Sequence, residues 1–276
     1  MKLSVFLSSA IFATAILAAP RSKRGLANRA QRRAVSTHAS APAQILHEGV
    51  VTEGDNVTHV QYSNNWAGAV LTAPPAGETF SAVSGQFTVP EASAPDGGSG
   101  TYSASIWVGI DGDTYGNAIL QSGVDVTVNS DGSQSYDSWY EWYPDYAHDF
   151  STDQFSFSAG DVISISITSS SNSVGTAVLE NLSSGQSVTQ QLSAPSSDAT
   201  LGGQNAEWIV EDFESGGSLV SFADFGTVTF SNCVASTGSE SLGTDGATII
   251  EIEDSNGNVL TDVSIPSSSE VTITYT

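Results

Sequence analysis

The chain has 276 residues, and its charges are strongly segregated: all seven Lys and Arg lie within the first 33 residues, where there is no Asp or Glu. Residues 34–276 therefore carry 30 acidic side chains and no permanent cation, which excludes a nucleic-acid site or a lysine-based phosphate site there. The single cysteine, Cys233, excludes an internal disulfide and a cysteine zinc cluster.

The first 19 residues have the pattern of a secretory signal peptide. Met1 and Lys2 precede an apolar run over residues 3–19, which ends in the small residues Ala18 and Ala19. A positive start, a short apolar stretch and a small-residue end are typical of such signals, and the run is short for a membrane span. We therefore expect a secreted, extracellular protein.

Residues 20–55 are interpreted as a basic pro-segment. They include the dibasic pairs Lys23-Arg24 and Arg32-Arg33, and they precede a strongly acidic region. A basic arm joined to an acidic domain has an evident electrostatic partner. Because carboxylates become protonated in acid, that attraction weakens as the pH falls. This suggests, as a hypothesis, that acid releases the pro-segment.

From about residue 60 the sequence predicts an all-β domain, which we assign to residues 56–276. Short runs of alternating apolar and polar residues are separated by turn signals such as Asp131-Gly132 and Asn256-Gly257. The predicted strands are residues 83–89, 105–110, 118–128, 138–143, 161–168, 177–179, 207–213, 228–230, 248–252 and 271–275. No useful stretch has a helical period, so we expect one antiparallel β-sandwich or barrel.

Several predicted strands carry acidic or amide side chains among apolar and aromatic ones. Period two places Trp107 and Asp111 on one face of their strand, while Gln121, Glu141 and Glu211 interrupt other apolar strands. Each of these residues alone is compatible with a solvated face. Because such groups are costly to bury without hydrogen bonds, all of them together favour one shared site.

Six segments at and around these residues follow one another in a characteristic order. They are residues 65–71, 107–113, 118–123, 139–144, 179–182 and 205–213. In these segments the chain resembles the glutamic peptidases, the eqolisin family. The resemblance implies two bent antiparallel sheets packed as a lectin-like (concanavalin-like) sandwich with a concave cleft. It also implies a secreted, acid-acting endopeptidase that is insensitive to pepstatin and is made as a zymogen.

The resemblance also implies roles for individual residues. Gln121 and Glu211 match the catalytic pair, and Trp107, Asp111 and Glu141 match residues that line or support the site. A glutamate is still partly ionised in acid, where histidine is protonated, and a glutamine amide does not titrate. The expected partners are protein and peptide substrates and the chain's own pro-segment. We expect a monomer, with no cofactor, metal, nucleic acid or membrane after signal removal.

Two other classes of function remain open at this stage. A glycoside hydrolase on a similar sandwich would use two carboxylates, such as Glu141 and Glu211. A lectin-like module would use the aromatic and acidic residues only to bind sugar, because fold alone does not decide function. The substitution Gln121→Ala separates them, since it should abolish peptidolysis and a glycosidase could tolerate it.

The excess of acidic groups also predicts how stability depends on pH. Without cations nearby, mutual repulsion raises the carboxylate pKa values in the folded protein. A raised folded pKa favours the native state at low pH, and this advantage is lost as the pH rises. We therefore expect greater stability near about pH 3–4 than at about pH 8.

Overall fold

The computed structural model describes residues 38–53 and 56–276, which lie in a compact unit spanning residues 37–276. The predicted signal peptide and the basic residues of the predicted pro-segment lie outside the described residues. Regular structure within the described ranges consists of β-strands and one 3-10 turn, Pro95–Gly97. None of it is a helix long and apolar enough to cross a membrane. The predicted all-β class is confirmed.

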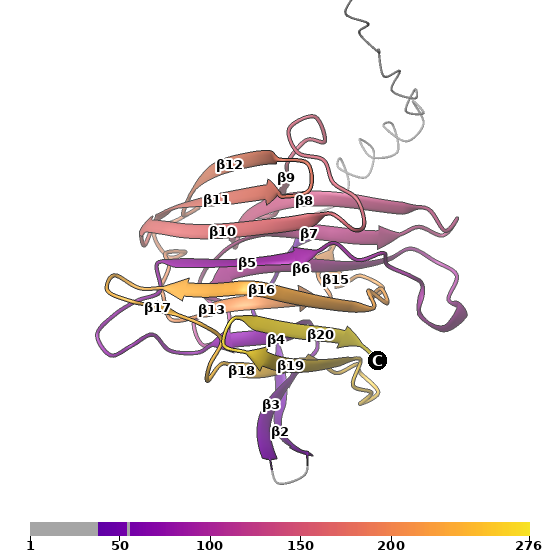
Figure 1. Ribbon diagram of the computed structural model, residues 1–276, viewed down its shortest axis with the longest axis horizontal. Helices are drawn as coiled ribbons and strands as arrows, with labels where there is room; N and C mark the ends of the chain where they lie inside the picture. Colours follow the sequence, from indigo (N-terminus) through magenta and orange to yellow (C-terminus); the bar gives the residue numbers. More distant parts are fainter. Residues whose placement is uncertain (1–37, 54–55) are drawn as a thin grey trace, which may run out of the picture. The chain divides into compact units, whose positions relative to one another are not determined.

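Two large sheets pack face to face as a β-sandwich (Figure 1), which decides between the sandwich and the barrel. The nine-stranded sheet has the order β2 (Ile45–Glu53), β3 (Asn56–Ser63), β18 (Thr248–Ile252), β4 (Trp66–Leu71), β13 (Ala206–Glu211), β6 (Tyr102–Ile110), β7 (Ile119–Val128), β8 (Gln134–Tyr143) and β9 (His148–Asp149). The second sheet has the order β12 (Gln186–Ser193), β11 (Val174–Asn181), β10 (Val162–Ser171), β5 (Ala82–Thr88), β16 (Thr227–Ser236), β20 (Glu270–Tyr275) and β19 (Thr261–Ser267), with β17 (Ser241–Leu242) on β16. A small third sheet joins β1 (His38–Ala39), β14 (Glu214–Ser215) and β15 (Ser218–Leu219). Pairing is antiparallel in these sheets apart from β18 with β3, which is parallel.

The main hydrophobic core lies between the two large sheets. Strand β13 contributes Trp208, whose indole Nε1 donates to the Ser84 carbonyl of β5 at 2.8 Å and so joins the two layers. In the same core, Phe87 and Phe230 pack edge to face, with ring centroids 5.3 Å apart. The alternating pattern of each strand places these large side chains inward, which is the burial that stabilises the sandwich.

Strand β7 is buried on both of its faces. Leu120 and Val124 point into the main core, whereas Ile119 belongs to a second hydrophobic cluster. That second cluster lies on the outer face of the nine-stranded sheet and contains Trp66, Val70, Trp107, Ile119, Trp139, Ile209 and Ile250. The outer face is therefore covered, although strand alternation alone would leave it open to solvent.

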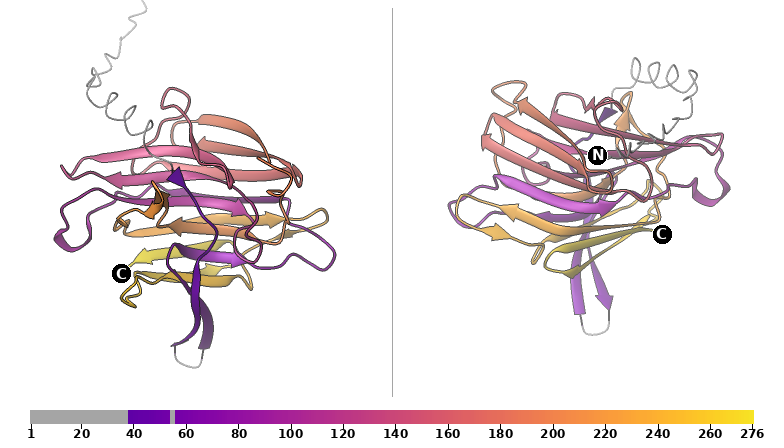
Figure 2. Two further views of the ribbon diagram at one scale, coloured as in Figure 1. Left: turned by 180° about the vertical axis from the view of Figure 1, so that it is seen from behind. Right: turned by 45° about the horizontal axis from the view of Figure 1, so that its top comes forward.

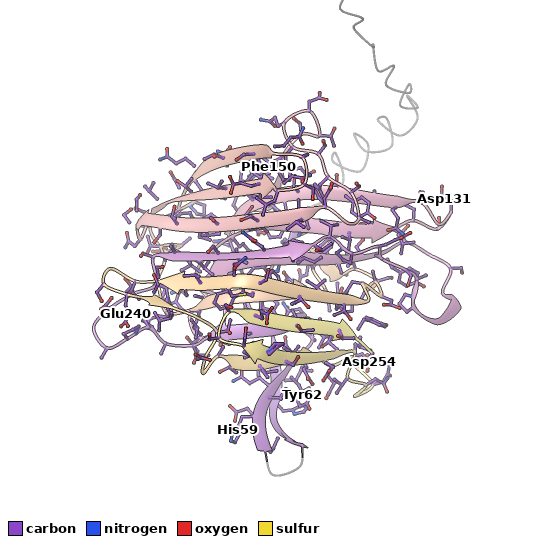
Figure 3. All side chains as sticks on the ribbon, in the orientation of Figure 1. His59, Tyr62, Asp131, Phe150, Glu240 and Asp254 are labelled. Atoms are coloured by element: carbon purple, nitrogen blue, oxygen red, sulfur yellow. The ribbon has the colours of Figure 1, made fainter. Side chains whose placement is uncertain are left out.

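Strands β2 and β3 form a hairpin that projects beyond the sandwich, and Figure 3 labels His59 and Tyr62 on it. All of β2 belongs to the predicted pro-segment, so this part of the predicted pro-segment is an edge strand of the large sheet. This strand is not among those predicted from the sequence. Strand β12 was also missed, because its alternating side chains are mostly polar and exposed.

Candidate active site

Neighbouring strands place Gln121, Glu141 and Glu211 on one face of the nine-stranded sheet. Gln121 of β7 lies opposite Glu141 of β8 on one side and Gly109 of β6 on the other. Glu211 of β13 lies opposite Ser105, four residues before Gly109 on β6. Since directly opposed residues point to the same face, and so do residues four apart on one strand, all of these positions face outward from the main core.

The outward-facing polar residues form two rows across the strands, one with Gln121 and Glu141 and the other with Glu211. A row of aromatic side chains lies between them. Trp107 is opposite Ile209 on β13 and Gly123 on β7, and Gly123 is opposite Trp139 on β8. A Cβ at Gly123 would lie 2.5 Å from Trp107 Cβ and 2.8 Å from Trp139 Cζ2. The glycine is therefore needed for the two indoles to pack over β7.

Residues 38–44, which we call the strap, cross the outer face of this sheet; they belong to the indigo segment that leads into β2 in the left view of Figure 2. The strap covers the polar rows so completely that Gln121, Glu141 and Glu211 have no exposed surface. Ala43 of the strap packs on the second hydrophobic cluster. The predicted site is therefore occupied by the protein's own N-terminal segment.

Gln121 and Glu211 bind the two ends of one peptide unit of the strap. The Gln121 amide Nε2 donates to the Ser40 carbonyl oxygen at 3.1 Å. The next backbone N–H, that of Ala41, donates to Glu211 Oε1 at 3.2 Å. The other oxygen of Glu211, Oε2, accepts the indole N–H of Trp107 at 2.9 Å. An amide donor and a carboxyl group thus act on the same peptide bond.

Glu141 positions both the glutamine and the strap. Its Oε2 accepts Gln121 Nε2 at 3.3 Å and the Ser40 backbone N–H at 3.1 Å. Because one oxygen receives both donors, it fixes the direction of the Gln121 amide relative to the Ser40 peptide unit. Glu141 therefore holds the Gln121 amide and the Ser40 peptide unit in place relative to each other.

The carboxyl groups of this face have strongly perturbed pKa values. Burial raises the pKa of Glu211 to about 8, although hydrogen bonds from Ser40, Trp107 and Ala41 act in the opposite direction. Loss of hydration likewise raises the pKa of Glu141 and of Glu207 well above the ordinary value. With the strap in place these groups are held as neutral carboxylic acids through the acidic range.

Asp111 is held apart from this group. It follows the end of β6, and Ile110 before it pairs with Ala206, at the opposite end of β13 from Glu211. Its two carboxyl oxygens accept the backbone N–H groups of four consecutive residues, 202–205, at 2.6–3.3 Å. These contacts anchor a loop, and none of them joins Asp111 to Gln121 or Glu211. Of the five predicted site residues, the structure brings together Gln121, Glu211, Glu141 and Trp107.

Three further residues line this site and were not among the predicted ones. Trp66 Nε1 donates to the Ala41 carbonyl at 3.0 Å, and Asn65 Nδ2 donates to the Pro42 carbonyl at 3.2 Å. Asp125 Oδ1 accepts the Trp139 indole N–H at 2.9 Å. Asp125 is four residues after Gln121 on the same strand, so alternation was the signal that could have found it.

Comparison with known proteins assigns this arrangement to a class. The sequence profile of the Peptidase A4 family matches residues 64–275. The chain belongs to this family, the glutamic peptidases or eqolisins, and is thus a hydrolase that acts on proteins. The family and the enzyme class expected from the sequence are therefore confirmed.

The similarity extends over the whole chain. Aspergillopepsin-2 of Aspergillus niger is 45% identical, covering 100% of both chains, and Scytalidopepsin B of Scytalidium lignicola is 41% identical, covering 80% of this chain and 81% of the relative. The crystal structure of scytalido-glutamic peptidase with a transition state analog inhibitor superposes with a TM-score of 0.67 at 40% identity, over 77% of this chain and 98% of that one. Aspergilloglutamic peptidase from Aspergillus niger gives a TM-score of 0.59 at 54% identity, over 63% and 99%. These matches confirm the β-sandwich of the glutamic peptidases.

Proposed function

We propose that this glutamic peptidase is a secreted, acid-acting endopeptidase in which Gln121 and Glu211 perform the chemistry. The observation that carries the proposal is the pair of contacts at one peptide unit: Gln121 Nε2 on a carbonyl oxygen and Glu211 Oε1 on the adjoining amide nitrogen. A peptidase needs a donor at the first atom and a proton carrier at the second.

The proposed reaction uses one water molecule. The Glu211 carboxylate takes a proton from the water, whose oxygen then attacks the carbonyl carbon of the bound peptide. Gln121 Nε2 donates a hydrogen bond to the oxyanion that forms, and such a donor contributes about 3 kcal/mol in other enzymes. Glu211 then gives its proton to the amide nitrogen, the C–N bond breaks, and a carboxylic acid and an amine leave.

Removal of the strap is needed before Glu211 acts as a base on other substrates. Burial is the largest cause of its raised pKa, so access of water lowers that pKa towards the ordinary value near 4.5. Glu211 is then partly ionised in mild acid, and Gln121 remains a neutral donor at every pH. Trp107 supports this role because its indole N–H stabilises the Glu211 carboxylate.

The proposal also covers export, the pro-segment, the substrates and the oligomeric state of the protein. Residues 1–19 direct export, residues 20–55 serve as the pro-segment, and residues 56–276 form the catalytic domain. The substrates are proteins and peptides, and the pro-segment is an intramolecular partner. The enzyme works as an extracellular monomer, and its reaction uses no metal or cofactor.

The test is cleavage of denatured haemoglobin or casein at about pH 3, where a glutamate is still partly ionised, with pepstatin present throughout. The full-length wild type is first incubated in acid until processing is complete, and each variant is incubated for the same time. Glu211→Gln and Gln121→Ala should each lower the rate by roughly 100-fold or more. Glu180→Gln and Gln191→Ala, which alter exposed residues of the other sheet, serve as matched controls and should cut at the unchanged rate.

Two results would contradict the proposal. One is undiminished cleavage by either site variant, which would remove that residue from the mechanism. The other is the absence of cleavage by folded, processed wild type, or its loss on addition of pepstatin.

A further inference from the structure

The strap lies in the site as an extended peptide that is bonded through its main chain. On its N-terminal side, β1 pairs antiparallel with β14, and the Ala147 N–H donates to the His38 carbonyl at 3.1 Å. On its C-terminal side, the Ala43 N–H donates to the Gly112 carbonyl at 2.9 Å. Addition of an extended segment through backbone hydrogen bonds is a common way for a protein to bind a peptide.

The register of the strap is fixed on both sides of the Ser40–Ala41 bond. On one side, the His38 ring lies 4.2 Å from that of Phe213, and its Nδ1 is 3.2 Å from Asp125 Oδ2. On the other side, three backbone groups of the strap bind Trp66 and Asn65. They are the Ala41 and Pro42 carbonyls and the Gln44 N–H, at distances of 3.0, 3.2 and 2.9 Å. A shift by one residue would break both sets of contacts, so no neighbouring bond reaches Gln121 and Glu211.

We propose that Ser40–Ala41 is the peptide bond that this enzyme cuts in its own chain. The inference rests on the proposed function, because it assigns the same chemistry to the peptide already seated between Gln121 and Glu211. Ser40 is fully buried, so cutting begins when the strap opens enough to admit one water molecule beside Glu211. That water also rehydrates the carboxyl group and restores its ionised form.

The proposed step is a hydrolysis that consumes one water. The water oxygen bonds to the Ser40 carbonyl carbon, and the bond from that carbon to the Ala41 nitrogen breaks. One water proton passes through Glu211 to the nitrogen. The products are a fragment that ends in the Ser40 carboxylic acid and a chain that begins with the Ala41 amine. Because bond and catalyst belong to one molecule, the reaction is first order in protein.

The experiment follows the full chain by intact mass and N-terminal sequencing after transfer from neutral pH to about pH 3. We expect the first new N-terminus to be Ala41, with a rate constant that does not change with protein concentration. Ala41→Pro removes the N–H that Glu211 accepts, and it should slow this cut by roughly 100-fold. Ala41→Ser keeps the backbone N–H and a small side chain. In this variant the bond between residues 40 and 41 should be cut as fast as in wild type.

Casein cleavage in the same samples separates the two proposals. If wild type cuts casein but no chain beginning at Ala41 forms, the proposal of self-cleavage at Ser40–Ala41 is wrong and the proposed function stands. If folded wild type cuts neither casein nor itself, the proposed function fails and the inference fails with it. Formation of the Ala41 terminus in Glu211→Gln, with folding verified by near-ultraviolet circular dichroism, would identify another protease as its source. A rate constant that rises with protein concentration would show cleavage between molecules and overturn the inference.

Discussion

Gln121 and Glu141 lie directly opposite each other on β7 and β8, and the amide Nε2 of the first is 3.3 Å from the carboxyl Oε2 of the second. The same carboxyl oxygen also accepts the Ser40 N–H. An amide in a flexible side chain is an effective donor only when its direction is fixed, and this contact fixes it. Glu141 is thus a positioning residue for Gln121.

We expect Glu141→Ala to lower kcat by roughly tenfold or more, with a smaller change in KM, because a misdirected donor weakens the transition state most. Glu141→Gln should retain most of the activity, since a glutamine oxygen still accepts the Gln121 amide. The measurement is steady-state kinetics on one peptide substrate in acid. Equal losses in the two variants would argue that the carboxyl group does more than position Gln121.

Trp107→Phe keeps an aromatic ring beside Gly123 but removes the N–H that binds Glu211. That hydrogen bond lowers the pKa of Glu211, so its loss should raise the pKa. A base with a higher pKa becomes ionised only at higher pH. We therefore expect the acidic limb of the kcat/KM profile to move upward by about one pH unit. If the maximum of kcat/KM falls while the acidic limb stays at the same pH, the indole acts only by packing.

Asp111→Asn tests whether this residue serves the loop or the reaction. Asparagine tolerates the positive φ of 70° at this position, but its single oxygen leaves some of the four loop N–H groups facing an amide donor. We expect a loss of about 2 kcal/mol in the free energy of unfolding and a lower Tm by roughly 4–8 °C. The kcat below that transition should be unchanged. The exposed Asp198→Asn is the control, and a large fall in kcat with an unchanged Tm would place Asp111 in the reaction instead.

Thermal unfolding should reveal the buried acids through its dependence on pH. Burial raises the pKa of Glu141 and Glu207, and it raises that of Asp212 to about 8. A raised folded pKa stabilises the protein below the ordinary carboxyl pKa near 4, and this stability is lost as the pH rises towards 8. In Glu211→Gln, which is expected not to cut itself, the Tm should be roughly 10 °C or more lower at pH 8 than at pH 4.

Glu207→Gln provides the internal test of this explanation. Neither carboxyl oxygen of Glu207 has a hydrogen-bond partner among the described residues, so a neutral amide replaces the protonated acid with little loss. Added to Glu211→Gln, it should reduce the fall in Tm between pH 4 and pH 8. Glu180→Gln, at an exposed position, should leave the fall unchanged. A Tm that rises with pH in the parent would contradict the explanation.

Alternation was sufficient to predict strands such as those around residues 118–128 and 138–143, since their apolar side chains repeat with period two. It was not sufficient for the mostly polar edge strand β12. The meeting of Gln121 with Glu141 depends on the register between β7 and β8, which no local pattern encodes, and there the family resemblance supplied what periodicity did not. The same resemblance grouped Asp111 with the site because residues 107–113 form one continuous motif. In the structure the chain leaves the strand after Ile110, which separates Asp111 from Gln121 and Glu211.

The strap had no detectable sequence signal. Residues 38–44 are mostly small, with no alternating pattern of large apolar side chains, and their conformation is determined by contacts with distant residues such as Trp66 and Glu211. The charge pattern predicts an electrostatic pairing of the N-terminal region with the acidic domain, through basic residues that lie outside the described part of the chain. It did not indicate that neutral backbone groups make the contacts at the site.

Strand β2 follows the strap directly and pairs with β3 from Ile45 to Glu53. If the chain is cut before Ala41, residues 41–44 stay attached through this strand, next to the groups that cut them. A short tether keeps the new N-terminus at an effective concentration in the millimolar range near the site. At that concentration residues 41–44 act as an inhibitor that saturates the site. The newly cut enzyme therefore begins as a complex with its own product. Its activity on other proteins should rise after a lag, and the length of that lag reports the detachment of β2 rather than the chemistry.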